Sequence, residues 1–237
     1  MPPIKPFMVG CLALMLVLAA FALGEPERIL WGFLIVAFYA AFDLLWTFLK
    51  RKIWYFPTSS LISGLILGLI AAPAANAAYA AALAFLAVFG KQALHWNKGR
   101  HIFNPAAFSL GILYFFTPSI SWWAPSLAGT NTLSLITLLL VGVFIVWKIN
   151  KWRIVLPFLA VYALGLFSTQ LFDGTLIFFM AVMLIEPVTS AFSSRKSAAA
   201  YGVLVGAFAV LLSYFTSLDP LIFGLLAGNF AAALLRL

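Results

Sequence analysis

Continuous apolar blocks fill most of this sequence, and their number and lengths limit its fold more than any other feature. We count ten blocks, at about residues 7–24, 28–49, 60–71, 76–92, 104–117, 131–148, 153–169, 173–185, 197–215 and 219–236. They do not alternate in the manner of the ~10-residue strands of a membrane barrel. Only 8% of the residues are charged, whereas soluble domains carry about 25%. We therefore predict an all-α integral membrane protein, folded as a single membrane domain over residues 1–237.

Several blocks are too short to cross a bilayer as straight helices. The block at 60–71 would reach only about 18 Å, whereas the hydrocarbon layer is about 30 Å thick. The blocks at 104–117 and 173–185 are similarly short. Such segments persist at membrane depth only where they are buried in protein or line a cavity. We therefore expect some of them to end inside the bundle.

The blocks divide into two sets of five, at residues 1–122 and 123–237. An odd number of helices in each set inverts the second set relative to the first. A short block falls third in each set, and the segment 104–110 resembles 229–235 in the two fifth blocks. The sequence thus predicts about ten transmembrane helices in two inverted five-helix repeats with short or broken helices. Interrupted segments at matching positions point to a central binding site.

Basic residues lie between the apolar blocks. If the N-terminus is inside, all but Arg28 of the 14 Lys and Arg residues fall on the inner side. The outer loops then hold Glu25, Glu27, Asp173 and Asp219. This bias predicts a multi-pass protein of the cytoplasmic (cell inner) membrane with both termini in the cytoplasm. It also accounts for the net charge of +8 without a nucleic-acid partner, so the expected surroundings are the lipid bilayer.

A short polar run turns into an apolar helix at residues 99–110. Asn104 at the N-cap and Pro105 at the first helical position predict the helix start. The unpaired backbone donors of such a start suit an acceptor-rich or anionic ligand. His101 and Asn104, three residues apart, could direct hydrogen-bonding groups at one ligand near the inner face. Alternatively, Asn104 only caps the helix and His101 lies in interfacial water.

Two acidic residues, Asp43 and Glu186, are candidates for an ion or proton pathway, because acids at membrane depth are usually functional. In the alternative interpretation, Glu186 pairs with Arg100 or Arg195, and Asp43 reaches Lys50 or solvent. The sequence contains no dinucleotide-binding glycine fingerprint, Walker loop, histidine metal pair or nucleophile triad. We therefore predict neither a catalytic residue nor a metal site within this chain.

Four motifs in order resemble one known family. They are Ser63-Gly-Leu-Ile-Leu-Gly-Leu-Ile-Ala-Ala-Pro73, Gly90-Lys-Gln92, Ile102-Phe-Asn-Pro-Ala106 and Glu186-Pro-Val-Thr-Ser190. The chain is similar, over nearly its whole length, to the family of the D subunit of the Rnf electron-transport complex and the B subunit of the sodium-translocating NADH:quinone oxidoreductase. The resemblance implies a ten-helix bundle of two inverted halves, related to urea and ammonium channels. It also implies flavin-mediated electron transfer across the membrane, coupled to cation transport.

The resemblance suggests specific flavin contacts. Asn104 matches the second Asn of the family pattern Asn-Ile-Phe-Asn-Pro, and it is the expected riboflavin contact; His101 replaces the first. Pro105, with Phe103 and Phe108, would provide a flat apolar slot at this helix start. The family also carries FMN on a threonine of an outer loop. Thr130 lies in that region, but no Asp precedes it and a glycine replaces the usual Ala. We therefore expect riboflavin or FMN to be bound non-covalently rather than attached covalently.

The leading functional hypothesis is a flavin-associated membrane subunit for transmembrane electron transfer, within a redox-driven cation-translocating complex. Because no motif for NADH is present, other membrane or peripheral redox subunits would have to supply the electrons and would be its partners. A quinone is a further candidate partner. The alternative is a small-solute or flavin transporter or channel on the same inverted-repeat scaffold. A third interpretation is a structural subunit that only packs against partners.

Overall fold

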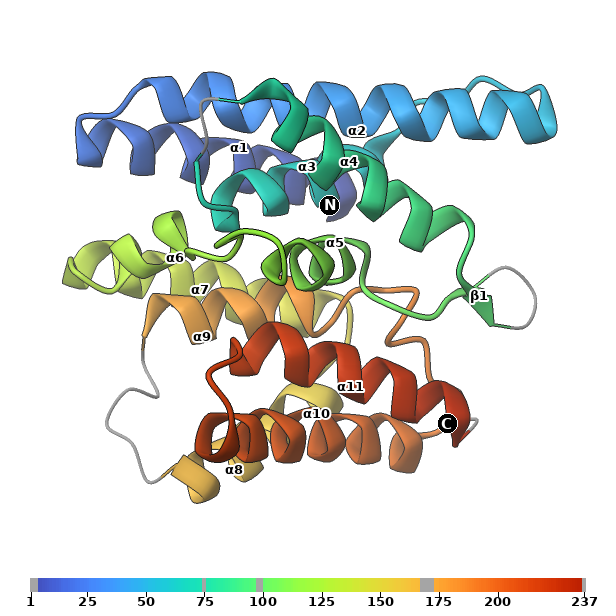
Figure 1. Ribbon diagram of the computed structural model, residues 1–237. Coiled ribbons are helices and arrows are strands. Elements are labelled where there is room, and N and C mark those ends of the chain that lie inside the picture. The colour runs from blue at the N-terminus through green and yellow to red at the C-terminus, as the bar shows by residue number, and fades with distance from the viewer. Residues whose placement is uncertain (1–3, 74–75, 97–99, 167–172, 236–237) are drawn as a thin grey trace.

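A computed structural model describes residues 4–73, 76–96, 100–166 and 173–235 as a helical bundle (Figure 1). Its elements in chain order are α1 (Ile4–Leu23), α2 (Glu27–Arg51), α3 (Thr58–Ile70), α4 (Ala77–Gln92), β1 (His95–Trp96), β2 (Arg100–His101), α5 (Pro105–Tyr114), α6 (Trp123–Ala128), α7 (Thr132–Lys148), α8 (Trp152–Leu166), α9 (Gly174–Phe178), the π-helix η2 (Phe179–Met183), α10 (Arg195–Phe215) and α11 (Pro220–Leu234). The end of the predicted block 153–169, together with Lys98 and Arg236, lies outside the described residues.

The all-α prediction is confirmed, and each predicted block corresponds to a helical segment. Among the described residues, three helices are long and apolar enough to cross a membrane, namely α1, α2 and α10. The other apolar helices have 10–17 residues, which corresponds to about 15–26 Å. Sequence analysis missed the short helix α6 and the antiparallel pair β1–β2. It also placed the end of the 104–117 block too late, because α5 ends at Tyr114.

Side-chain caps determine where most of the later helices begin. In the described residues, an oxygen of the preceding residue accepts a hydrogen bond from the first turn of α4, α5, α7, α10 and α11; these residues are Asn76, Asn104, Asn131, Ser194 and Asp219. Each cap satisfies a backbone N–H that has no partner within its helix. The predicted cap at Asn104 is therefore confirmed.

Helix α3 ends inside the molecule, and other segments satisfy its last carbonyl groups. The Ile70 carbonyl accepts hydrogen bonds from the backbone N–H groups of Ser121 and Trp122, at 2.9 and 3.1 Å. The Gly68 carbonyl accepts one from the indole Nε1 of Trp123, at 2.9 Å. A helix can end at this depth because no carbonyl of these two residues is left without a donor. The loop 119–122 therefore supplies hydrogen-bond donors to the C-terminal end of α3, which is too short to span a membrane alone.

Glycines bring α3 close to α2. A Cβ atom added to Gly64 would lie 2.9 Å from the Cα atom of Val36, and one added to Gly68 would lie 2.9 Å from the Cα atom of Gly32. Only residues without a side chain allow this approach, which is typical of helix pairs in membranes. Gly64 and Gly68, four residues apart, therefore lie at the contact of α3 with α2.

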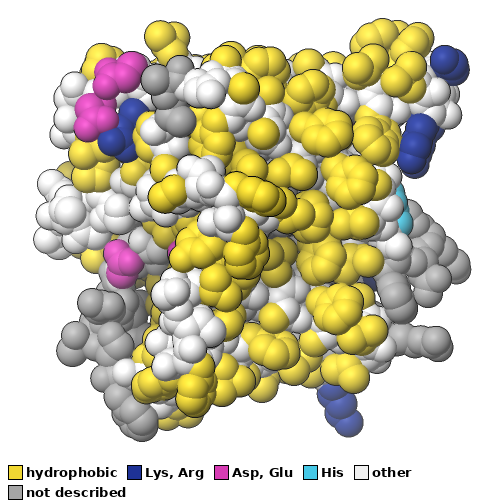
Figure 2. All heavy atoms as spheres, in the orientation of Figure 1, with side chains coloured by type: hydrophobic (Ala, Val, Ile, Leu, Met, Phe, Trp, Pro, Cys, Tyr) yellow, Lys and Arg dark blue, Asp and Glu magenta, His cyan; other side chains and the backbone are white. Residues whose placement is uncertain are grey.

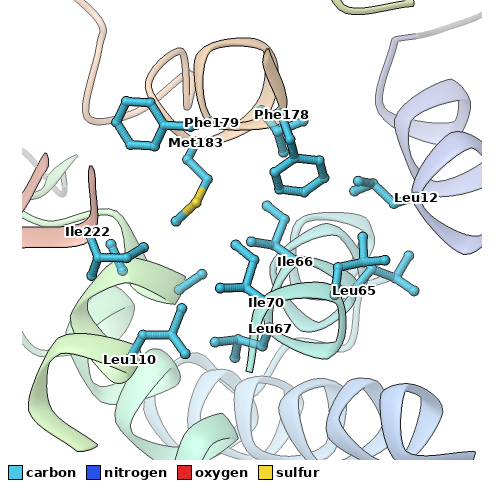
Figure 3. Close-up of a cluster of buried hydrophobic side chains, with 14 of the residues drawn as sticks. Leu12, Leu65, Ile66, Leu67, Ile70, Leu110, Phe178, Phe179, Met183 and Ile222 are labelled. Carbon is cyan, nitrogen blue, oxygen red and sulfur yellow. The ribbon is translucent and has the colours of Figure 1, made fainter. Parts of the chain in front are cut away.

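The short helices meet in an apolar centre (Figure 3). Side chains from α1, α3, α5, α9, η2 and α11 fill it, and all of them are buried: Leu12, Leu65, Ile66, Leu67, Ile70, Leu110, Phe178, Phe179, Met183 and Ile222. Residues far apart in the sequence thus share one core. This core joins the first five helices to the last ones.

Neighbouring helices pack in a similar order in both parts of the chain. In the first part, α1 packs on α3, α2 on α4 and α4 on α5; in the second, α7 packs on α9 and η2, α8 on α10 and α10 on α11. The extensive contact of α2 with α3 has no counterpart of that extent between α8 and α9 in the described residues. Charge is also separated along the helix axes. In Figure 2, the acidic side chains visible on this face lie at the left of the view, with one basic side chain among them; the other visible basic side chains lie toward the right or at the bottom, beyond a hydrophobic band. These features give the chain the character of a membrane protein.

Candidate functional site

His101 and Glu186 come together where β2 meets the loop after η2. The imidazole Nε2 of His101 lies 3.4 Å from Oε2 of Glu186, and the imidazole is buried. The same carboxylate oxygen accepts hydrogen bonds from the backbone N–H and the hydroxyl of Thr189, at 2.8 and 2.7 Å. We call these three residues the Glu186 cluster. Glu186 thus pairs with His101 rather than with the alternative partners Arg100 and Arg195. Arg100 instead donates a hydrogen bond to the Ala191 carbonyl.

Asn104 lies beside this cluster, and protein groups occupy its polar atoms. Its Oδ1 caps α5 at Ala107, and its Nδ2 donates to the Met183 carbonyl at 3.1 Å. Its backbone N–H donates to Oδ1 of Asn229, whose Nδ2 donates to the hydroxyl of Tyr201. The π-helix η2 ends at Met183, and π-helices often occur at functional sites. Asn104 therefore connects the end of η2 to α11.

The aromatic residues predicted to form a slot pack on each other. The rings of Phe103 and Phe108 stack with their centroids 5.6 Å apart, and Phe103 also stacks on Phe230 at 6.5 Å. Pro105 is buried at the first position of α5. In this arrangement the rings leave no planar space between Phe103 and Phe108, and Asn104 has no free polar atom. A flavin contact at Asn104, His101, Phe103, Pro105 or Phe108 stays a prediction that requires these contacts to open.

A second polar cluster surrounds Asp43, which is completely buried in α2. Its carboxylate accepts from Nζ of Lys91 and Nε2 of Gln92, both at 2.7 Å, and from the hydroxyls of Tyr55 and Ser60. We call these five residues the Asp43 cluster. The carboxylate therefore reaches neither Lys50 nor solvent, and its charge is balanced by Lys91 from α4. Sequence reasoning missed this pairing, although Lys91 belongs to the Gly90-Lys-Gln92 motif.

A groove between α1 and α7 reaches Thr130. Its volume is about 550 Å³, within the range of about 300–1,000 Å³ that is common for cofactor sites. Most of its lining is apolar, from α1, α7, α9 and η2, and the residues with polar side chains at its edge are Thr130, Asn131, Ser134 and Thr137. Leu14, Leu18 and Leu133 on its lining are largely exposed, so the groove opens sideways. We call this the α1–α7 groove.

The turn before α7 places Thr130 at the edge of this groove. The Thr130 hydroxyl donates to the Leu127 carbonyl at 2.8 Å. A Cβ atom added to Gly129 would lie 3.1 Å from Oδ1 of Asp173, so a carboxylate lies against this turn although none precedes Thr130 in sequence. The volume, the apolar walls and the polar edge fit a flavin ring better than the filled surroundings of Asn104 do.

Comparison with known proteins gives no further identification. No family model and no curated protein matches this chain.

Proposed function

We propose that this chain is a flavin-associated membrane subunit for transmembrane electron transfer, within a redox-driven cation-translocating complex. The α1–α7 groove is the observation that carries this proposal, because it combines a cofactor-sized volume with Thr130 at its polar edge. The residues that would hold riboflavin or FMN are Thr130, Asn131, Ser134 and Thr137 at the polar edge, with Val141 and Phe178 on the apolar wall. A bound flavin would supply the ability to accept and donate electrons one or two at a time.

The proposed arrangement is a bundle of ten segments in two inverted halves, with both termini in the cytoplasm. Two observations support it. The contacts α1–α3, α2–α4 and α4–α5 within residues 1–122 have the counterparts α7–α9, α8–α10 and α10–α11 within residues 123–237. On the face shown in Figure 2, most of the visible basic side chains also lie away from the end that carries the acidic ones, which agrees with the positive-inside rule. Other redox subunits, or a quinone in the bilayer, would supply and remove electrons.

A transporter on the same scaffold is the alternative. The buried pair of Asp43 and Lys91 favours it, because paired charges at membrane depth often belong to proton or ion pathways. The apolar centre favours electron transfer, because Ile66, Leu110 and Met183 fill the space where the short helices meet (Figure 3). A polar solute would have to displace these side chains, whereas electron transfer requires no such opening.

Flavin content of the purified full chain tests the proposal. Protein extracted in mild detergent should release riboflavin or FMN on denaturation, measured by chromatography with fluorescence detection. Ser134→Trp, which places an indole in the groove, should lower flavin content at least fivefold. Thr132→Trp is the matched control, because Thr132 is exposed on the same helix and does not line the groove. This control should retain its flavin.

Covalent attachment has its own readout. A fluorescent band that survives denaturing electrophoresis would show covalent FMN, and Thr130→Ala should abolish it while non-covalent flavin persists. Colourless protein that mediates solute uptake in vesicles would overturn the redox proposal in favour of the transporter. Colourless protein without uptake would leave only the structural interpretation.

A further inference from the structure

A second groove lies on a different side of the bundle, between α2 and α4. Its volume is about 290 Å³, and its walls are almost entirely apolar. The lining residues are Phe42, Leu45, Trp46 and Leu49 from α2, and Phe85 and Val88 from α4, with Lys50 at one end. Leu45, Leu49 and Phe85 are largely exposed, so the groove faces outward. Because α2 rises about 1.5 Å per residue, the groove follows it for about 10 Å.

Lys50 lines one end of this groove, and two further basic residues, Arg51 and Lys52, follow it in the chain. Lys50, Arg51 and Lys52 are all exposed, and none of them takes part in the ion pairs found in the described residues. The ammonium of Lys50 lies 5.0 Å from the ring centre of Trp46. The only acid nearby on α2, Asp43, is buried and already paired with Lys91. This end of the groove therefore carries positive charge that no carboxylate of α2 neutralises.

Aromatic residues mark the same end as lying at a membrane surface. Trp54 stacks on Phe48 with ring centres 4.8 Å apart, and Trp54 is 68% exposed. Exposed tryptophans next to Lys and Arg are typical of the headgroup layer. Trp46 itself lines the groove, and its indole Nε1 is buried with no hydrogen-bond partner in the described residues. The α2–α4 groove thus runs from an apolar wall to a positively charged end at headgroup level.

We infer that the α2–α4 groove binds an anionic phospholipid from the leaflet at the Lys50 end of α2. An acyl chain would lie along Phe42, Leu45 and Leu49, and the phosphate would lie among Lys50, Arg51 and Lys52. Charge complementarity selects this occupant, because an apolar groove that ends at Lys50, with the exposed Arg51 and Lys52 next in the chain, matches an acyl chain that ends in a phosphate. The inference does not depend on flavin binding, because this groove shares no lining residue with the α1–α7 groove.

Lipid retention by the full chain in detergent tests the inference. Native mass spectrometry would compare phosphatidylglycerol with phosphatidylcholine of the same acyl chains. Wild type should retain phosphatidylglycerol at least fivefold more strongly. The triple variant Lys50→Gln, Arg51→Gln, Lys52→Gln should lose this preference. A triple variant with the same charge change elsewhere, Arg153→Gln, Arg195→Gln, Lys196→Gln, should keep it.

Two further results separate a groove from general charge attraction. Leu45→Trp, which fills the apolar wall at an exposed position, should lower phosphatidylglycerol retention although no charge changes. Melting temperatures near the wild-type value would show that each variant is folded. Equal loss in both triple variants, or unchanged retention in Leu45→Trp, would overturn the inference. Equal retention of the two lipids by wild type would also overturn it.

Discussion

The Asp43 cluster and the Glu186 cluster each contain a carboxylate, but the two carboxylates differ in burial and in their hydrogen-bond partners. Asp43 is completely buried and accepts hydrogen bonds from four side chains of α4, α3 and the loop after α2. Glu186 has a partly exposed side chain, and its basic neighbour His101 lies at 3.4 Å without forming a hydrogen bond. The first cluster holds adjacent helices together, whereas the second lies where β2 meets the loop after η2.

The difference indicates where the molecule is rigid and where it can change. A fully satisfied buried network specifies one arrangement of its helices. Among the described residues, the Glu186 carboxylate accepts hydrogen bonds from Thr189 alone and has a longer contact with His101, so fewer contacts hold it in one arrangement. We therefore expect the Asp43 cluster to act mainly on stability. We expect the Glu186 cluster, together with Asn104, to respond to pH and to changes in helix packing.

We expect the largest effect from a substitution that breaks the charge pair of the Asp43 cluster. Lys91→Met leaves the Asp43 carboxylate buried without its cation and should destabilise the protein by about 3–5 kcal/mol. The double variant Asp43→Asn, Lys91→Met removes both charges and should recover most of this loss. Thermal unfolding in detergent measures both effects. A loss below about 1 kcal/mol for Lys91→Met would contradict a tightly coupled buried pair.

The next effect concerns the connection beside the Glu186 cluster. Asn104→Ala removes the cap of α5 and the shorter of two hydrogen bonds to the Met183 carbonyl, which also accepts from the backbone N–H of Glu186. The expected loss is about 2 kcal/mol. The matched control is Asn131→Ala, because Asn131 caps α7 at an exposed position; its expected cost is about 1 kcal/mol or less. Equal losses in the same unfolding assay would show that the contact with Met183 adds nothing.

A smaller effect depends on pH and should distinguish the two clusters. Burial raises the pKa of Glu186, but contacts with His101 and Thr189 outweigh it and hold the pKa below its usual value. Its contribution to stability is therefore present above about pH 4.3, the ordinary value, and is lost as the pH falls through the folded-state pKa. Lys151 also interacts electrostatically with this carboxylate.

Melting temperatures of wild type and Glu186→Gln, followed from pH 6 to pH 3, test this dependence. Wild type should be the more stable at pH 6, and the difference should shrink as the pH falls. A difference that stays constant over this range would mean that Glu186 gains nothing from its charge.

The sequence predicted local features well and long-range pairings poorly. Asn104 and Pro105 predicted a helix start, because this signal lies within two neighbouring residues. The contact of Lys91 with Asp43 depends on how α4 is rotated against α2, and the approach of Asp173 to Gly129 depends on where α9 enters the bundle. Stacking of Phe103 on Phe108 likewise follows from the packing of α5. No short-range pattern contains that information.

Riboflavin affinity of the flavin-stripped full chain tests the central claim most directly, by fluorescence titration in detergent. Ser134→Trp changes the α1–α7 groove, Thr132→Trp is its control, and Phe108→Leu changes the aromatic stack beside Asn104. If the flavin binds in the groove, Ser134→Trp should raise the Kd at least tenfold, whereas Thr132→Trp and Phe108→Leu should change it less than twofold. A Kd that rises in Phe108→Leu but not in Ser134→Trp would contradict the account.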